Sequence, residues 1–171
     1  LVFVTGAIGD GWLGLKAACD QLKLDPERIG ALISHYRAPV PRLDASGMVR
    51  DFASASADVS DGLIADVAHI ARASGVGVRI DLEVLPTSAA AQAWLGERVD
   101  EVAALRDLAT GGDDYEIVFT APARHEDTLR RLAEAQLVRL TRIGRVEAGS
   151  GVEVRHKGTP VSIASAGWSH R

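Results

Sequence analysis

The fold is decided by one stretch of sequence, residues 53–63, which reads ASASADVSDGL. Its run of small residues predicts a buried strand, and an amphipathic helix is expected to begin directly after it. Two carboxylates, Asp58 and Asp61, stand at this strand-to-helix turn with the hydroxyl of Ser60 between them. Oxygen ligands for a hard cation can converge at such a turn beside free backbone N–H groups. The stretch therefore predicts a site that handles metal-bound phosphates.

Helix capping is the alternative interpretation of the same three residues. An Asp or Ser side chain at a helix start satisfies free N–H groups and favours the positive end of the helix dipole. Capping needs only one of the three side chains, and two carboxylates this close repel each other unless a cation lies between them. From the sequence alone, both interpretations stay open.

The helix after the turn is expected over residues 61–74. One face of it is apolar and lies toward the core: Leu63, Ile64, Val67, Ile70 and Ala71. On this periodicity, Asp66, His69 and Arg72 face the solvent. Gly75 is expected to end the helix as its C-terminal cap.

The remaining elements interleave strands and helices, although not strictly. Strands are expected over residues 1–4, 76–82, 115–120, 140–147 and 152–154, with a tight turn at 149–151 before the last. Helices are expected over residues 12–22, 44–52, 86–108 and 124–136, with a break in the third near Gly96. Another helix is expected to begin at Pro26, with Asp25 as its cap, and to stop before Pro39. This order predicts an α+β sandwich in which a mixed β-sheet is covered by helices.

A second acidic motif, GGDDYE, covers residues 111–116. A pair of glycines allows a ligand to approach the backbone closely, and an apolar strand follows the acids. Neighbouring side chains of a strand point to opposite faces, so Asp113 and Asp114 cannot both face one ligand if the strand has already begun. Asp113, next to the glycines, is the freer of the two to reach into a pocket. A turn in which Asp bonds to the backbone explains the motif equally well.

A glycine-rich stretch, GAIGDG at residues 6–11, is less informative. Its glycine spacing is not that of the dinucleotide-binding fingerprint, and it lacks the Gly-Lys-Ser/Thr of a phosphate-binding loop. We expect it to be a structural turn between a strand and a helix.

Composition narrows the class of protein. The 171 residues suffice for one domain with a core, and the net charge of −4 argues against nucleic-acid binding. The single Cys19 excludes an internal disulfide and suits the cytoplasm, and no apolar run approaches the ~18 residues of a membrane span. The chain starts without Met, in the middle of an expected strand, so we expect it to be part of a longer protein.

The order of the motifs resembles that of a known family. VTGAIGD (4–10), PVPR (39–42), DVSDGL (58–63), GGDDYE (111–116) and a terminal GWSH (167–170) follow one another. This order resembles the C-terminal half of the bacterial thiamine-monophosphate kinases, which belong to the superfamily of aminoimidazole ribonucleotide synthetase. The resemblance covers essentially the whole chain.

The resemblance implies ATP-dependent phosphorylation of thiamine monophosphate to thiamine diphosphate. It implies that Asp58 and Asp61 bind several magnesium ions, that Ser60 contacts ATP, and that Asp113 and Trp168 contact the thiamine substrate. No residue stands out as a general base, and we assign none as catalytic.

The family also implies what this chain lacks. Residues 1–171 correspond to one C-terminal domain that binds substrate and ATP, and the N-terminal domain is absent. That missing domain supplies further metal ligands and most of the interface of a homodimer, so we expect the chain alone to have little or no kinase activity. Two alternatives remain: another ATP-dependent enzyme of the same superfamily, and a non-catalytic module whose acids bind a structural cation or cap helices.

Overall fold

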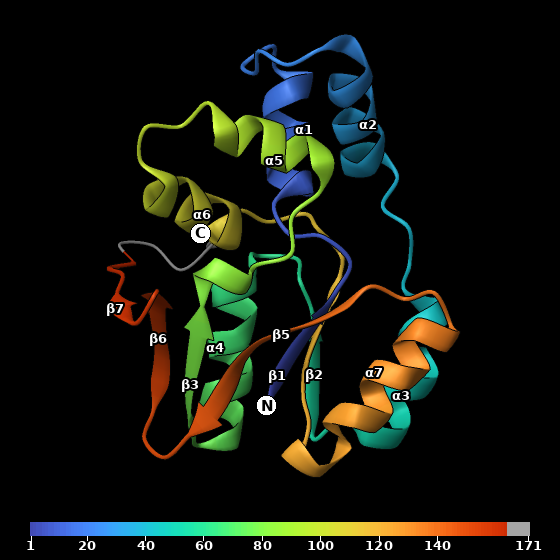
Figure 1. Cartoon of the computed structure of the whole chain (residues 1–171), viewed down its shortest axis with the longest axis vertical. Coiled ribbons are helices and arrows are strands. Elements are labelled where there is room, and N and C mark those ends of the chain that lie inside the picture. Colours follow the sequence, from blue (N-terminus) through green and yellow to red (C-terminus); the bar gives the residue numbers. More distant parts are fainter. Residues whose placement is uncertain (164–171) are drawn as a thin grey trace.

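A mixed β-sheet lies at the centre of the computed structural model, which describes residues 1–163 (Figure 1). Within those residues the sheet has seven strands in the order β2-β4-β1-β5-β3-β6-β7, and only β3 and β6 pair in parallel. The strands are β1 (Val2–Thr5), β2 (Ala55–Asp58), β3 (Gly77–Asp81), β4 (Ile117–Thr120), β5 (Leu140–Glu147), β6 (Gly151–His156) and β7 (Thr159–Pro160). The mixed sheet expected from the sequence is confirmed.

Helices cover both faces and one end of this sheet. They are α1 (Asp10–Ala18), α2 (Pro26–Arg37), α3 (Ser46–Phe52), α4 (Leu63–Ser74), α5 (Ala89–Gly96), α6 (Glu101–Thr110) and α7 (Glu126–Ala135), with 3₁₀ turns at Leu43–Ala45, Leu82–Val84 and Ala123–His125. Asp25 caps α2 by accepting the N–H of Arg28, and Gly75 ends α4 in a left-handed conformation, both as expected.

The alternation of side chains along β1 separates two apolar cores. Val2 and Val4 point to the face that α4 covers, and they belong to the larger core. Phe3 points to the other face, where its ring stacks on Phe119 at a centroid distance of 5.5 Å beneath α3 and α7. Burial on both faces explains why β1 and β4 are almost wholly apolar.

Three expectations need correction. The strand β2 is an edge strand paired only with β4 among residues 1–163, so its side chains are alternately half-buried and exposed rather than buried. The strand expected from residue 115 begins at Ile117, because Asp113 and Tyr115 have positive φ angles of 70° and 51°. The helix expected to reach residue 22 ends at Ala18.

The turn at residues 149–151 exists, but the strands that it joins are not neighbours. β5 and β6 lie on opposite sides of β3, which pairs with both. The sheet therefore contains a parallel pair that local sequence does not reveal.

The helices α1, α2, α5 and α6 lie together beyond one end of the sheet, at the top of Figure 1. The chain leaves β1 and β2 toward this end and enters β4 from it, so the glycine-rich stretch and both acidic motifs are brought there. In the described part of the chain, no helix is both long and apolar enough to cross a membrane.

Candidate functional site

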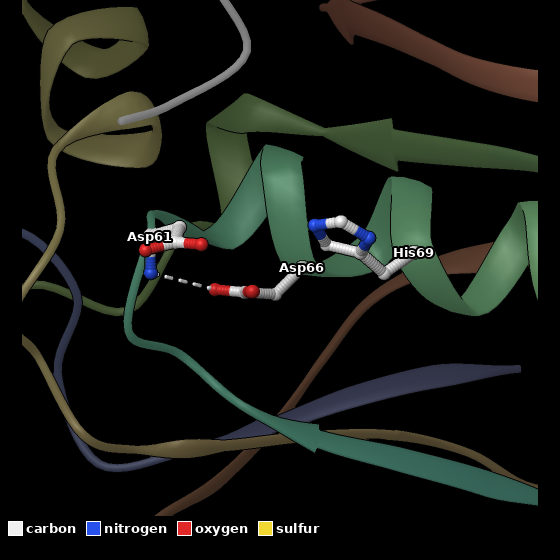
Figure 2. Close-up of side chains that lie close together, drawn as sticks. All are labelled: Asp61, Asp66 and His69. Atoms are coloured by element: carbon white, nitrogen blue, oxygen red, sulfur yellow. Dashed lines mark hydrogen bonds between the residues drawn. The ribbon is translucent and has the colours of Figure 1, made fainter. Parts of the chain in front are cut away.

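The turn between β2 and α4 is held by a carboxylate from the helix itself. The backbone N–H groups of Ser60 and Asp61 donate to one oxygen, Oδ2 of Asp66, over 3.0 and 3.2 Å. Figure 2 shows the bond from Asp61. The N-cap position of α4 is taken by Gly62, not by any of the three residues that capping would use. Capping in its simplest form therefore does not explain why Asp58, Ser60 and Asp61 occur together.

Asp66 is buried, which contradicts the solvent-facing position expected for it. Its exposed fraction is 5%. The turn folds back over the first turn of α4 and covers a side chain that the helical period alone places outside. Burial raises the pKa of Asp66, the two N–H donors oppose this shift, and the negative charges of Asp61 and Asp58 add to it. His69 and Arg72 are exposed, as expected.

The chemistry of the side chains at this turn fits magnesium better than a softer metal. Ligand atoms of Asp61, Asp66 and His69 lie within 4.8 Å of one another. The Nδ1 atom of His69, however, lies 2.6 Å from a guanidinium nitrogen of Arg72, and a neighbouring cation opposes metal binding there. Carboxylate oxygens are what remains, and magnesium prefers oxygen ligands.

The second acidic motif packs directly against this turn. The N–H of Asp113 donates to the carbonyl oxygen of Ser60 over 2.9 Å, and the N–H of Tyr115 donates to that of Val59 over 2.8 Å. A Cβ atom at Gly112 would lie 2.5 Å from the Ser60 carbonyl oxygen, so only glycine allows this approach. Two motifs about fifty positions apart in the sequence thus meet through their backbones.

Asp114 holds the glycine-rich stretch. Its two carboxylate oxygens accept the N–H groups of Gly9 and Gly11, each over 2.8 Å, and its exposed fraction is 1%. Burial raises the pKa of Asp114 to about 8, against the effect of the two N–H donors. These N–H groups are therefore occupied within the protein, as expected for a structural turn.

Glu116 closes the same end of β4 with partners that sequence reasoning missed. Arg42 binds it through two hydrogen bonds of 2.7 and 2.6 Å, and the hydroxyl of Thr5 donates to it over 2.7 Å. The signal available in the sequence was the PVPR motif itself, whose arginine follows two prolines that stiffen the chain. Its partner could not be read from spacing, because 74 positions separate the two residues.

The residues predicted to bind ligands are brought together only in part. Asp58 is exposed, while Ser60, Asp61 and Asp113 are partly exposed around the contact between the two motifs. Trp168 lies outside the described residues.

The sequence matches a known protein family over most of its length. A model of the family described as AIR synthase related protein, C-terminal domain, matches residues 1–157. The chain belongs to this family. The resemblance that the order of motifs indicated is thereby confirmed at the level of the superfamily.

Curated relatives of this AIR synthase related domain are named thiamine-monophosphate kinase. The protein of Caulobacter vibrioides is 45% identical over 99% of this chain, and that of Salmonella typhimurium is 38% identical over 99%. The chain covers 47% and 51% of these two proteins, so it spans about half the length of the curated relatives it matches.

Solved structures agree with the sequence relatives. The thiamine-monophosphate kinase from Stenotrophomonas maltophilia K279a superposes with a TM-score of 0.80 at 36% identity, over 94% of this chain and 50% of that one. The structure "AaThiL complexed with AMPPCP and TMP" gives 0.82 at 32% identity, over 99% of this chain and 50% of that one. E. coli HypE, at 17% identity and a TM-score of 0.63, shares the fold.

Proposed function

We propose that this chain is the C-terminal half of a thiamine-monophosphate kinase, which uses ATP and magnesium to convert thiamine monophosphate to thiamine diphosphate. One observation carries the proposal: the DVSDGL and GGDDYE motifs meet at one end of the sheet, joined by the hydrogen bond from Asp113 to Ser60. The similarity to a relative complexed with AMPPCP, an ATP analogue, and with TMP supports it.

In this proposal, Asp58 and Asp61 hold magnesium ions and the hydroxyl of Ser60 contacts ATP. Magnesium, when bound, neutralises phosphate charge and orients the two phosphates for in-line transfer. A phosphate oxygen of thiamine monophosphate attacks the γ-phosphorus of ATP, and the bond from that phosphorus to the β–γ bridging oxygen breaks to release ADP. The attacking oxygen is already ionised, so the chain needs no general base.

The thiamine moiety is assigned to Asp113 and Trp168. Thiamine has a cationic thiazolium ring and a flat aminopyrimidine ring. A partly exposed carboxylate suits the cation and the amine through charge and hydrogen bonding, and an indole suits a flat cation through stacking. Asp113 stands beside the Ser60 carbonyl, so acceptor and donor sites adjoin.

The other half of the kinase is assigned to a domain outside this chain. We assign to that domain the remaining metal ligands and most of a homodimer interface, and we place the reaction in the cytoplasm, where the exposed thiol of Cys19 stays reduced. The chain alone, with half of the proposed site, is expected to turn over little or no substrate.

The test compares ADP release by this chain alone and by the chain joined to an N-terminal half such as that of the Caulobacter vibrioides relative, with thiamine monophosphate, ATP and magnesium. Turnover is expected only in the joined protein, and Asp58→Asn should reduce it. If the chain alone turned over substrate nearly as fast as the joined protein, the proposal that it carries only half of the site would be refuted.

The acceptor is tested separately. Binding of thiamine monophosphate should weaken in Asp113→Asn, because the amide lacks the negative charge. Unchanged binding would favour a different phosphate acceptor within the superfamily. Unchanged magnesium-nucleotide binding in the double variant Asp58→Asn/Asp61→Asn would instead favour a non-catalytic module.

A further inference from the structure

We infer that Asp66 is a positioning residue. One of its carboxylate oxygens, Oδ2, accepts the N–H groups of Ser60 and Asp61 and thereby orients their side chains toward the metal-bound phosphates. The inference rests on the proposed function, because it concerns the same turn. The proposed function does not assign Asp66 to any ligand.

The geometry explains how one carboxylate can control the turn. Asp66 sits on the first turn of α4, between the buried Ile64 and Val67, and its own N–H donates to the carbonyl oxygen of Gly62. Its acceptor oxygen is therefore fixed relative to the larger core. The turn has no regular structure between Asp58 and Leu63, so without Asp66 the N–H groups of Ser60 and Asp61 would have to bond to water.

Ser60 is held from both sides as a result. Its N–H donates to Asp66 over 3.0 Å, and its carbonyl oxygen accepts the N–H of Asp113 over 2.9 Å. A shift of the Ser60 peptide would therefore displace the residues assigned to the nucleotide and Asp113, assigned to thiamine, together. Outer residues that orient metal ligands in this way typically matter by 10–100-fold in metal affinity or activity.

The competing role for Asp66 is that of a direct metal ligand, since it lies in the cluster with Asp61 and His69. An asparagine side chain at position 66 could perform the positioning role but would be a poorer metal ligand. In Asp66→Asn, the remaining carbonyl oxygen can still accept both N–H groups, whereas the charge and one carboxylate oxygen are lost. In Asp66→Ala, the acceptor is lost as well.

The experiment uses the full-length protein and two readouts. The first is amide hydrogen exchange at Ser60 and Asp61 without any metal, which reports the backbone alone. The second is the magnesium concentration for half-maximal binding of the ATP analogue AMPPCP. The matched control is Leu129→Ala, whose side chain is buried in the second core, on the opposite face of the sheet.

In Asp66→Ala, we expect both amides to exchange at least about tenfold faster and the half-maximal magnesium concentration to rise at least about tenfold. In Asp66→Asn, both readouts should stay within about threefold of wild type, because the acceptor remains. Leu129→Ala should leave both unchanged. If Asp66→Ala does not fold, Asp66→Leu fills the space without an acceptor, and Asp66→Asn still distinguishes the roles by itself.

Two results would overturn the inference. Equal loss of magnesium-dependent binding in Asp66→Asn and Asp66→Ala would make Asp66 a ligand, and wild-type behaviour of Asp66→Ala would leave it no role. Failure of the proposed function looks different: the wild-type protein itself would then not bind AMPPCP with magnesium, whereas the exchange measurement would still report on Asp66.

Discussion

Asp113 and Asp114 are neighbours in the sequence, yet the fold uses them differently. Asp114 is buried and gives both oxygens to backbone N–H groups of the glycine-rich stretch, while Asp113 stays partly exposed. The same division separates Asp66 from Asp61. At the scale of single residues, the buried Asp114 and Asp66 accept backbone N–H groups, whereas the partly exposed Asp113 and Asp61 are the acids that we propose as ligand-binding.

Gly112 allows the two motifs to touch, so Gly112→Ala should separate them. Its φ is not positive, which means that alanine is unstrained in itself and only the contact with the Ser60 carbonyl is lost. We expect the free energy of unfolding to fall by about 1–3 kcal/mol, as for other overpacked sites, in urea denaturation. The Michaelis constant for thiamine monophosphate should rise in the joined protein.

The control for this change is Gly30→Ala. Gly30 lies inside α2, and a Cβ atom there would meet nothing within 4 Å. Alanine at such a position stabilises a helix by up to about 1 kcal/mol. If Gly112→Ala behaved like Gly30→Ala, the close approach of the two motifs would have no energetic importance.

At the scale of elements, periodicity predicted what depends on local sequence. The apolar face of α4 is buried as expected, and the strand expected over residues 76–82 is β3, in which the buried Val78 and Ile80 alternate with the partly buried Arg79 and Asp81. Periodicity failed for Asp66, and the run of small residues in β2 wrongly predicted a buried strand. Burial of Asp66 comes from a turn that folds over the helix, and the edge position of β2 comes from strand order, and neither is a local property.

The candidate site divides in the same way. The residue types that can bind a cation, in the order Asp58, Ser60, Asp61, could be read directly. The partners of the buried carboxylates could not, because Asp114 bonds to backbone N–H groups and Glu116 to the Arg42 side chain, in each case more than seventy positions away.

The pair of Arg42 and Glu116 ties the segment after α2 to the start of β4. Glu116 is 1% exposed and the Arg42 side chain 26%, so Arg42→Met should leave a buried carboxylate with Thr5 as its remaining side-chain partner. We expect a loss of about 3 kcal/mol in the free energy of unfolding, at the lower end for a broken buried pair because Arg42 is partly solvated.

Arg50→Met is the matched control, because Arg50 pairs with Asp51 at the surface with side-chain exposures of 77% and 52%. Such pairs contribute at most about 1 kcal/mol. Equal losses in the two variants, measured by urea denaturation, would contradict a special role for the buried pair.

At the scale of the whole molecule, charge and burial are distributed unevenly. Asp10 begins α1, Asp66 lies in the first turn of α4, and Asp114 accepts the N–H groups of Gly9 and Gly11; burial raises the pKa of each. At the surface, Asp51 and Glu147 have arginine partners that lower their pKa values, and they stay ionised above pH 5. Burial therefore opposes the ionisation of these three acids, whereas arginine partners favour the ionisation of Asp51 and Glu147.

This distribution predicts that the chain is less stable at pH 8 than at pH 5.5. The folded protein keeps a proton on Asp114 up to about pH 8, whereas the unfolded chain releases it near the ordinary value of 3.8. Between these values the folded state binds more protons, so the free energy of unfolding falls as the pH rises, by at most about 1.4 kcal/mol per pH unit for one group. Urea denaturation at several pH values measures this slope of the free energy of unfolding against pH.

The control is Asp114→Asn, in which the slope should be shallower. Burial lowers the pKa of the Leu1 amino group, which contributes a slope of opposite sign, but this contribution is the same in both proteins and cancels in the comparison. Identical slopes in wild type and Asp114→Asn would mean that Asp114 is ionised in the folded state, held so by the N–H groups of Gly9 and Gly11.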